Sequence, residues 1–257
     1  MPIRFNNRPG LVAYFTVGDP DLATSKRIAL AALDAGADVL ELGVPFSDPL
    51  ADGPVIQRAS ERAVKNGTRL RDVLELAAEL RAARPRAGLV IFSYLNPILR
   101  MGVEEFAKAA ERAGVDAVLI TDLIAEESEQ YRAVMSQHHL QTIFLAAPTS
   151  PDERLQRIAG VSEGFIYAIS RVGITGAQQQ VAEEARALVE RLRRFTSLPI
   201  ALGFGISNAA HVAAVAEFAD AAVVGSAIVS IIENSSPEQA PAAVGAFIAG
   251  LRVPAAV

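Results

Sequence analysis

Short apolar segments alternate with longer segments of helical periodicity along the whole chain. The predicted strands cover residues 11–17, 38–44, 89–94, 117–121, 142–146, 165–169, 200–204 and 221–224. The predicted helices cover residues 22–35, 56–65, 69–83, 103–113, 125–138, 151–159, 179–195, 207–217, 226–233 and 237–251. This alternation is typical of a parallel sheet covered by helices. Eight such strands in 257 residues predict an α/β fold of the (β/α)₈ TIM-barrel class, with a doubly wound open sheet as the alternative.

The composition favours one large buried core, in one domain that spans residues 1–257. Hydrophobic residues make up 51% of the chain, and no low-complexity linker divides it. A net charge of −5 without a Lys/Arg cluster argues against a nucleic-acid partner. No apolar run reaches the ~18 residues of a membrane helix, and the first residues do not show the basic-then-apolar pattern expected of a signal sequence. Because cysteine is absent, we expect a cytoplasmic protein without disulfides.

Carboxylates cluster after the second predicted strand, where ADVLELGV leads into PFSDPLADGP. Glu41 lies inside the apolar run, where an ionised carboxylate is costly unless it is paired and where burial raises the pKa. Active sites of barrels lie at the carboxyl ends of the strands, which predicts catalytic roles for Glu41 and for Asp52 in the adjoining loop. Asp48 and Asp122 are rivals, although Asp48 has the sequence context of a turn. The alternative for Glu41 is a solvent-facing position at a sheet edge.

Glycine-rich turns follow the last two predicted strands, in GFGIS (203–207) and VVGSAIV (223–229). Each places glycine where a helix begins, so that backbone N–H groups and the helix dipole can meet an anion. Barrels often bind phosphate at this place, and these turns predict a phosphate site, with two ordinary helix starts as the alternative. The loop SRVGITGAQQQ after the sixth strand has the character of a mobile lid, or of a flexible loop without a role.

Other catalytic chemistries lack the residues that they need. His138, His139 and His211 lie in predicted helices rather than at strand ends. No lysine stands at a strand end, which argues against a Schiff-base aldolase. No motif has metal-ligand spacing, so we expect no metal site. Acid–base catalysis therefore falls to the carboxylates.

Six motifs together resemble the alpha subunit of tryptophan synthase. They are YFTVGDP, ELGVPFSDPLADGPVIQRAS, SYLNPI, RVGITGA, GFGIS and VVGSAIV, all within residues 11–233. The resemblance implies a TIM-barrel lyase that cleaves indole-3-glycerol phosphate to indole and glyceraldehyde 3-phosphate in L-tryptophan biosynthesis. It also implies an α₂β₂ complex in which indole passes to the β subunit. The β subunit would hold pyridoxal phosphate, and no cofactor is expected in this chain.

The resemblance also assigns roles to individual positions. Glu41 matches the general acid–base carboxylate, and Asp52 matches the carboxylate near the indole nitrogen. Tyr167 matches the family tyrosine that adjoins Glu41, and Thr175 matches the lid hydroxyl that contacts the Asp52 position when the lid is closed. The phosphate cradle matches Gly176, Phe204, Gly205, Gly225 and Ser226. The indole pocket matches Tyr14, Phe92 and Leu119, and the surfaces that face β match residues 45–52 and 94–97.

Two positions depart from the family pattern. The segment before the first strand, MPIRFNNRPG, is too short for the amphipathic helix that often closes the barrel bottom. Ile124 stands where the family usually has a proline, in a loop expected to touch β, so binding to β could be altered. The rival functions are another phosphate-binding barrel enzyme, a lyase that works without a partner, and a subunit that mainly regulates β.

Overall fold

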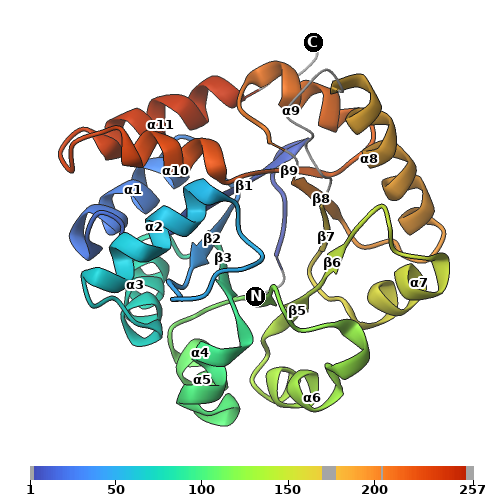
Figure 1. Ribbon diagram of the computed structural model, residues 1–257, viewed down its shortest axis with the longest axis horizontal. Helices are drawn as coiled ribbons and strands as arrows, with labels where there is room; N and C mark the ends of the chain where they lie inside the picture. The colour runs from blue at the N-terminus through green and yellow to red at the C-terminus, as the bar shows by residue number, and fades with distance from the viewer. Residues whose placement is uncertain (1–2, 170–177, 204, 253–257) are drawn as a thin grey trace.

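Parallel strands form a barrel at the centre of the protein, and helices surround it (Figure 1). The computed structural model describes residues 3–169, 178–203 and 205–252. Its strands are β1 (Gly10–Thr16), β2 (Val39–Gly43), β3 (Gly88–Ser93), β4 (Ala117–Ile120), β5 (Gln141–Ile143), β6 (Leu145–Ala146), β7 (Ile166–Ile169), β8 (Ile200–Gly203) and β9 (Ala221–Val224). The sheet order is β5-β4-β3-β2-β1-β9-β8-β7-β6, and only Phe144 separates β5 from β6. The predicted strand at 142–146 therefore supplies both ends of the sheet and closes it, which confirms the barrel.

Helices alternate with the strands as the sequence predicts. They are α1 (Leu22–Asp34), α2 (Pro54–Lys65), α3 (Leu70–Ala83), α4 (Leu95–Met101), α5 (Val103–Arg112), η1 (Ala125–Glu127), α6 (Glu129–Gln137), α7 (Asp152–Val161), α8 (Gln178–Arg193), α9 (Ala209–Ala216), α10 (Ser226–Glu233) and α11 (Ala240–Leu251). Helices α2 and α10 are additional to the outer ring and pack against each other and against β1 (Figure 1). None of the described helices combines the length and apolar character needed to cross a membrane.

Helix α4 lies in the SYLNPI motif and is absent from the helices that the sequence predicts. The backbone N–H of Leu95 donates to Asp122 Oδ1 at 2.7 Å, and this bond satisfies one of the free donors of the first helical turn. Pro97 also lies in that first turn, where its missing N–H has no intrahelical partner to lose. The single helix predicted at 125–138 is divided at Ser128, whose hydroxyl donates to the Ala125 carbonyl at 2.9 Å.

Side chains inside the barrel form a smaller core than the one between the sheet and the helices. This inner core comprises Ile3, Val12, Val39, Val90, Ala117, Leu119, Ile143, Phe165, Ala201, Ala221 and Val223. Successive side chains of a strand point to opposite faces, so Glu41 points into the barrel as Val39 does. Its register neighbours are Tyr14 of β1 and Val90 of β3, so β2 is not an edge strand. The alternation along β2 therefore buries this carboxyl group.

The short N-terminal segment closes the bottom of the barrel without a helix. Ile3 is buried, and the Phe5 ring centroid lies 5.8 Å from that of Phe165. Gly10 leaves room for the Phe5 ring, because a Cβ at this position would lie 2.2 Å from a ring carbon. These two apolar side chains thus cover the bottom of the inner core.

Candidate active site

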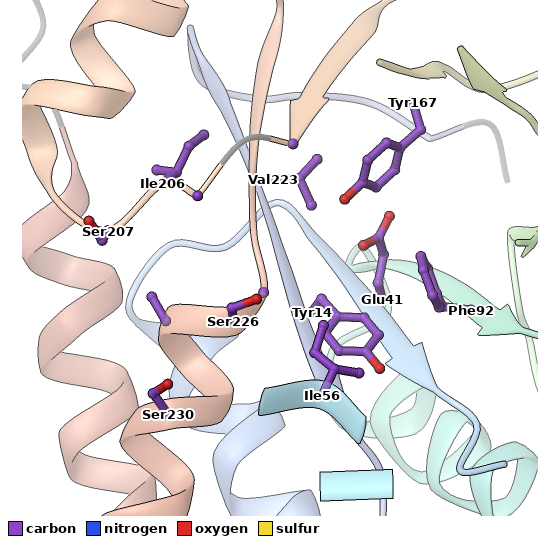
Figure 2. Close-up of a pocket in the computed structure, with 14 residues that line it drawn as sticks. Tyr14, Glu41, Ile56, Phe92, Tyr167, Ile206, Ser207, Val223, Ser226 and Ser230 are labelled. Carbon is purple, nitrogen blue, oxygen red and sulfur yellow. The ribbon is translucent and has the colours of Figure 1, made fainter. Parts of the chain in front are cut away.

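A cavity of about 330 Å³ opens at the carboxyl ends of the strands (Figure 2). Its lining residues are Tyr14, Glu41, Ile56, Phe92, Tyr167, Gly203, Gly205, Ile206, Ser207, Val223, Gly225, Ser226, Ala227 and Ser230. They come from six strands or strand ends and from the additional helices α2 and α10. Apolar walls with a few polar groups are the usual form of a small-molecule site.

Glu41 contributes the carboxyl group of the cavity wall, and its side chain is 0% exposed. Neither carboxylate oxygen has a hydrogen-bond partner among the described residues. Burial raises the pKa of Glu41 to about 8. Figure 2 shows the carboxyl group pointing towards Tyr167, with Phe92 beside it. Burial, followed by the charge of Glu41, raises the pKa of Tyr167 well above its usual value. Because its own pKa is about 8, Glu41 is protonated at neutral pH and can give a proton to a molecule in the cavity.

Aromatic side chains form the apolar wall of the cavity. The rings of Tyr14 and Phe92 meet edge to face, with centroids 5.0 Å apart. Two glycines leave the space that the tyrosine hydroxyls occupy. A Cβ on Gly43 would lie 2.6 Å from the Tyr14 hydroxyl oxygen, and one on Gly203 would lie 2.6 Å from that of Tyr167. The resulting wall suits a flat aromatic ligand.

Backbone turns and hydroxyl groups form the other end of the cavity. Gly205 has a φ of +47°, a left-handed conformation that favours glycine. Gly225 and Ser226 stand at the N-terminus of α10, whose first N–H groups and dipole favour an anion. Ser207 and Ser230 add two more hydroxyl groups. The described lining residues include no lysine or arginine, so an anion here would be held by N–H and O–H donors.

Asp52 lies beside the cavity rather than on its wall. The Tyr94 hydroxyl donates to Asp52 Oδ2 at 3.0 Å and accepts from the Ala51 N–H at 2.9 Å. Burial raises the pKa of Asp52 to about 6, and the hydrogen bond from Tyr94 opposes this rise. Burial and then the charge of Asp52 raise the pKa of Tyr14. Asp52 is therefore within electrostatic reach of the cavity wall.

Comparisons with known proteins agree on one family. The family model for the tryptophan synthase alpha chain matches residues 2–251. The alpha chain of Solibacter usitatus is 46% identical over 238 residues, which cover 93% of this chain and 89% of the relative. The alpha chain of Thiobacillus denitrificans is 46% identical over 250 residues, which cover 97% of this chain and 92% of the relative. The chain belongs to the tryptophan synthase alpha chain family.

Solved structures extend the agreement to three dimensions. The tryptophan synthase complex from Pyrococcus furiosus matches with a TM-score of 0.87 and 36% identity, covering 95% of this chain and 98% of that chain. Tryptophan synthase subunit alpha from Legionella pneumophila matches with a TM-score of 0.85 and 35% identity, covering 94% and 90%. As a tryptophan synthase alpha chain, this protein is a lyase that cleaves indole-3-glycerol phosphate in tryptophan biosynthesis.

Most of the site residues expected for a tryptophan synthase alpha chain meet at the cavity. Those that line it are Tyr14, Glu41, Phe92, Tyr167, Gly205, Gly225 and Ser226. Asp52 lies beside it, and Leu119 is buried in the inner core instead of lining the cavity. Thr175, Gly176 and Phe204 lie outside the described residues, and so does most of the predicted lid, residues 170–177.

The rival carboxylates have structural partners. Asp48 accepts a hydrogen bond from the Ser47 hydroxyl within its turn, and Asp122 caps α4. Among the residues that the structure describes, no group of three or more His, Cys, Asp or Glu side chains is arranged to hold a metal ion.

The sequence interpretation missed several residues of the site. Tyr94 was assigned to a surface facing β, yet its hydroxyl is the hydrogen-bond partner of Asp52. Its place directly after β3 is a signal that could have found it, because strand ends converge at the mouth. Ser230 follows Ser226 by four positions and so shares its helix face, which is a second usable signal. Ile56 gave no signal of its own, because an apolar residue in the first turn of a helix is ordinary.

Proposed function

We propose that Glu41 is the general acid and base of the cleavage reaction and that Asp52 serves the indole nitrogen. The burial of Glu41, with both carboxylate oxygens unpartnered among the described residues, is the observation that carries the proposal. A buried and unpaired carboxyl group destabilises a fold, so packing gives no reason to keep it. Its pKa of about 8 suits a group that must give and then take a proton near neutral pH.

The reaction needs two proton transfers at neighbouring atoms. Protonated Glu41 gives its proton to indole C3, which makes an indolenine cation, and the Asp52 carboxylate stabilises the N1–H of that cation. The Glu41 carboxylate then takes the proton of the glycerol 3′-hydroxyl group. The bond between C3 and the glycerol chain breaks, its electron pair returns to the indole ring, and an aldehyde forms. Glu41 ends protonated, ready for the next turnover.

Two ends of the cavity hold the two ends of the substrate. We assign the indole ring to the wall of Tyr14, Phe92 and Tyr167, and the phosphate to the turns at Gly205, Gly225 and Ser226. The phosphate binding energy fixes the glycerol chain and brings its 3′-carbon to Glu41. Gly176 and Phe204 would complete this phosphate cradle, as they do in the family pattern. Leu119 supports the indole end from the inner core.

The chain works with a β subunit in an α₂β₂ complex, in our proposal. The Pyrococcus furiosus structure is a tryptophan synthase complex, and this chain matches one of its chains over nearly the full length. Large apolar side chains are exposed around the mouth, notably Leu50 at 90% exposure on the 45–52 loop, Leu99 after β3 and Ile124 after β4. Ile124 in place of the family's proline would weaken this contact. The Thr175 hydroxyl would meet Asp52 on lid closure, and a partner that prefers the closed state would raise activity.

Three further assignments complete the proposal. This chain needs no cofactor of its own, because the proposed steps are proton transfers, and pyridoxal phosphate belongs to the β subunit. All described strands belong to one sheet, which supports a single domain for residues 1–257. Tryptophan biosynthesis and the absence of cysteine support a cytoplasmic location.

The test is indole release from indole-3-glycerol phosphate by the purified full chain, with and without a β subunit. We expect slow cleavage by the chain alone, faster cleavage with β, and much slower but measurable cleavage by the Asp52→Asn variant. Thr175→Val should remove much of the gain from β without affecting the fold. Normal cleavage by Asp52→Asn would contradict the role of that carboxylate. Equal rates with and without β, in a mixture shown to form the complex, would contradict the proposed coupling.

A further inference from the structure

An ion-pair network joins the two additional helices that flank the cavity. Arg62 of α2 donates from Nε and Nη2 to the two carboxylate oxygens of Asp19, both at 2.8 Å. Its third nitrogen, Nη1, donates to Glu233 Oε1 of α10 at 2.7 Å. Arg58, one turn earlier on α2, donates to both oxygens of Glu233 at 2.8 and 2.7 Å. The hydrogen bonds and charges of the two arginines lower the pKa of Glu233 to about 2, so Glu233 is ionised at neutral pH.

Helix α2 carries the loop that holds Asp52. Gln57 Nε2 donates to the Asp52 carbonyl at 3.0 Å and to the Pro49 carbonyl at 3.3 Å. The Ser60 hydroxyl accepts from the Phe46 N–H at 2.8 Å and donates to the Phe46 carbonyl at 3.0 Å. The loop is therefore fastened to α2 at both of its ends, and a shift of α2 would carry Asp52 with it.

Helix α10 carries the phosphate end of the cavity. Its N-terminus bears Ser226, and Ser230 one turn later also lines the cavity, whereas Glu233 ends the helix. Between the two helices lies a small apolar cluster in which Ala59 of α2 and Val229 of α10 pack with Tyr14. Such a small apolar contact leaves the sliding of one helix along the other weakly opposed, because the hydrophobic effect is non-directional.

We propose that Arg62 is a positioning residue that fixes the distance between Asp52 and the phosphate end of the cavity. This inference rests on the proposed function, in which Asp52 meets the indole nitrogen while the turn before α10 holds the phosphate. One substrate spans both places, so the two must keep a constant separation. Arg62 sets that separation because it links α2 to α10 through Glu233 and to the turn after β1 through Asp19, which is buried.

The chemistry of the guanidinium group explains why arginine stands here. All three of its nitrogens donate in fixed directions, two to one carboxylate and one to another. A lysine ammonium would keep the charge but act as a compact point donor, so it could not hold both carboxylates in one geometry. Without Arg62, α2 would keep two separate polar links, from Arg58 to Glu233 and from Asn66 to the Gly18 and Pro20 carbonyls, but no single rigid group would contact both carboxylates. A misplacement of about 1 Å at a reacting group can cost on the order of 10²-fold in rate.

The experiment compares Arg62→Gln with wild-type full chain, with and without a β subunit, in indole release and in binding of glycerol phosphate. We expect kcat to fall about 10- to 100-fold, while the Kd of glycerol phosphate stays within about twofold, because the phosphate turns are untouched. The combination with Asp52→Asn is decisive. If Arg62 acts through Asp52, the double variant should be no slower than Asp52→Asn alone.

Arg81→Gln is the matched control, because Arg81 pairs with buried Asp116 at the opposite end of the barrel. Its side chain is 19% exposed, against 34% for Arg62, so a comparable loss of stability is expected without a loss of kcat. Arg62→Lys replaces Arg62→Gln if the latter does not fold, with the same loss of kcat expected. A wild-type kcat in the folded Arg62 variant, or losses that multiply in the double variant, would overturn the inference. A wild-type chain that fails to cleave the substrate would instead overturn the proposed function.

Discussion

The bottom of the barrel and the catalytic site use carboxyl groups in opposite ways. At the bottom, three aspartates precede strands, namely Asp38, Asp116 and Asp220. Each accepts an N–H from the start of the neighbouring strand, from Leu11 at 2.9 Å, Leu89 at 2.9 Å and Ile200 at 2.8 Å, respectively. Each also pairs with an arginine, namely Arg252, Arg81 and Arg193, respectively. At the mouth, Glu41 has no partner among the described residues, and Asp52 has one hydrogen bond from Tyr94.

The difference lies in what the surroundings offer to the negative charge. A carboxylate that accepts a backbone N–H from the neighbouring strand and contacts a guanidinium group holds the two strands together. A carboxyl group buried without such partners holds its proton more tightly, and its pKa rises into the range where it can exchange protons in catalysis. The paired aspartates at the bottom of the barrel therefore contribute stability, whereas the two carboxyl groups of the catalytic site lower stability and provide proton transfer.

Replacing Glu41 by Gln should have the largest effect. Gln keeps the shape but cannot transfer a proton, so kcat for indole formation should fall by about 10²–10⁴-fold. The free energy of unfolding of the variant should instead rise relative to that of the wild type as the pH increases. Below about pH 4.5 this carboxyl group is protonated in the folded and unfolded chain alike. Between about pH 4.5 and 8 the unfolded chain releases a proton that the folded chain keeps, so wild-type stability falls as the pH rises.

Steady-state indole assays and urea unfolding at pH 5 and pH 8 check both parts of this prediction. The Gln variant should lose less stability than the wild type between these two pH values, because it lacks the titrating group. Near-normal turnover in the variant would remove Glu41 from the mechanism. An unchanged pH dependence of unfolding would show that Glu41 is not protonated by burial.

Replacing Asp116 by Ala should have the reverse profile, with a large loss of stability and an unchanged kcat. The change leaves the Leu89 N–H and the Arg81 guanidinium without their carboxylate, at a cost of about 3 kcal/mol in the free energy of unfolding. Arg84→Gln breaks the exposed pair with Asp34 and should cost less than about 1 kcal/mol. Denaturant unfolding measures both, and similar losses in the two variants would contradict the distinction between buried and exposed pairs.

The fold could be predicted because its signal is local and repeated. Every strand carries its own apolar run, and the eightfold alternation leaves few topologies that bury all of them. The acidic residue in β2 could also be predicted as special, because Glu41 is ionisable and the residues beside it are apolar. Helix α4 was missed because its start depends on Asp122, 27 positions away. The closure of the bottom was missed because Phe5 packs on Phe165, which periodicity cannot show.

Partnerships over long distances in the chain explain the rest of the missed site. Tyr94 meets Asp52 across 42 positions, and Arg62 meets Asp19 across 43 and Glu233 across 171. An arginine on a helix is ordinary in sequence, and nothing local marks it as the link between two helices. Residue type and spacing thus find the groups that carry chemistry, whereas the groups that hold them in place emerge only from the packed structure.

The third prediction concerns the phosphate end of the mouth. Gly205→Val should weaken binding of glycerol phosphate by roughly 30-fold, because the β-branched side chain disfavours a positive φ by about 2 kcal/mol and blocks close approach to the turn. Gly102→Val is the matched control, since Gly102 also has a positive φ but has no atom near its Cβ position and lies off the cavity. Calorimetric titration of both variants compares them, and equal weakening would attribute the effect to backbone strain alone.

The smallest effect, and the one most specific to the mouth, is the pH dependence of kcat/KM. The proposed active form has Asp52 ionised and Glu41 protonated, so activity should be highest between their pKa values of about 6 and about 8. Below the lower value Asp52 gains a proton, and above the higher value Glu41 loses one, so kcat/KM should fall about tenfold at pH 5 and at pH 9. Tyr94→Phe sharpens the assignment. Its hydroxyl lowers the pKa of Asp52, so its removal should move the acidic limb to higher pH and leave the basic limb in place. A flat profile from pH 5 to 9 would contradict the roles given to both carboxyl groups. A Tyr94→Phe variant that moves only the basic limb would show that the two roles are reversed.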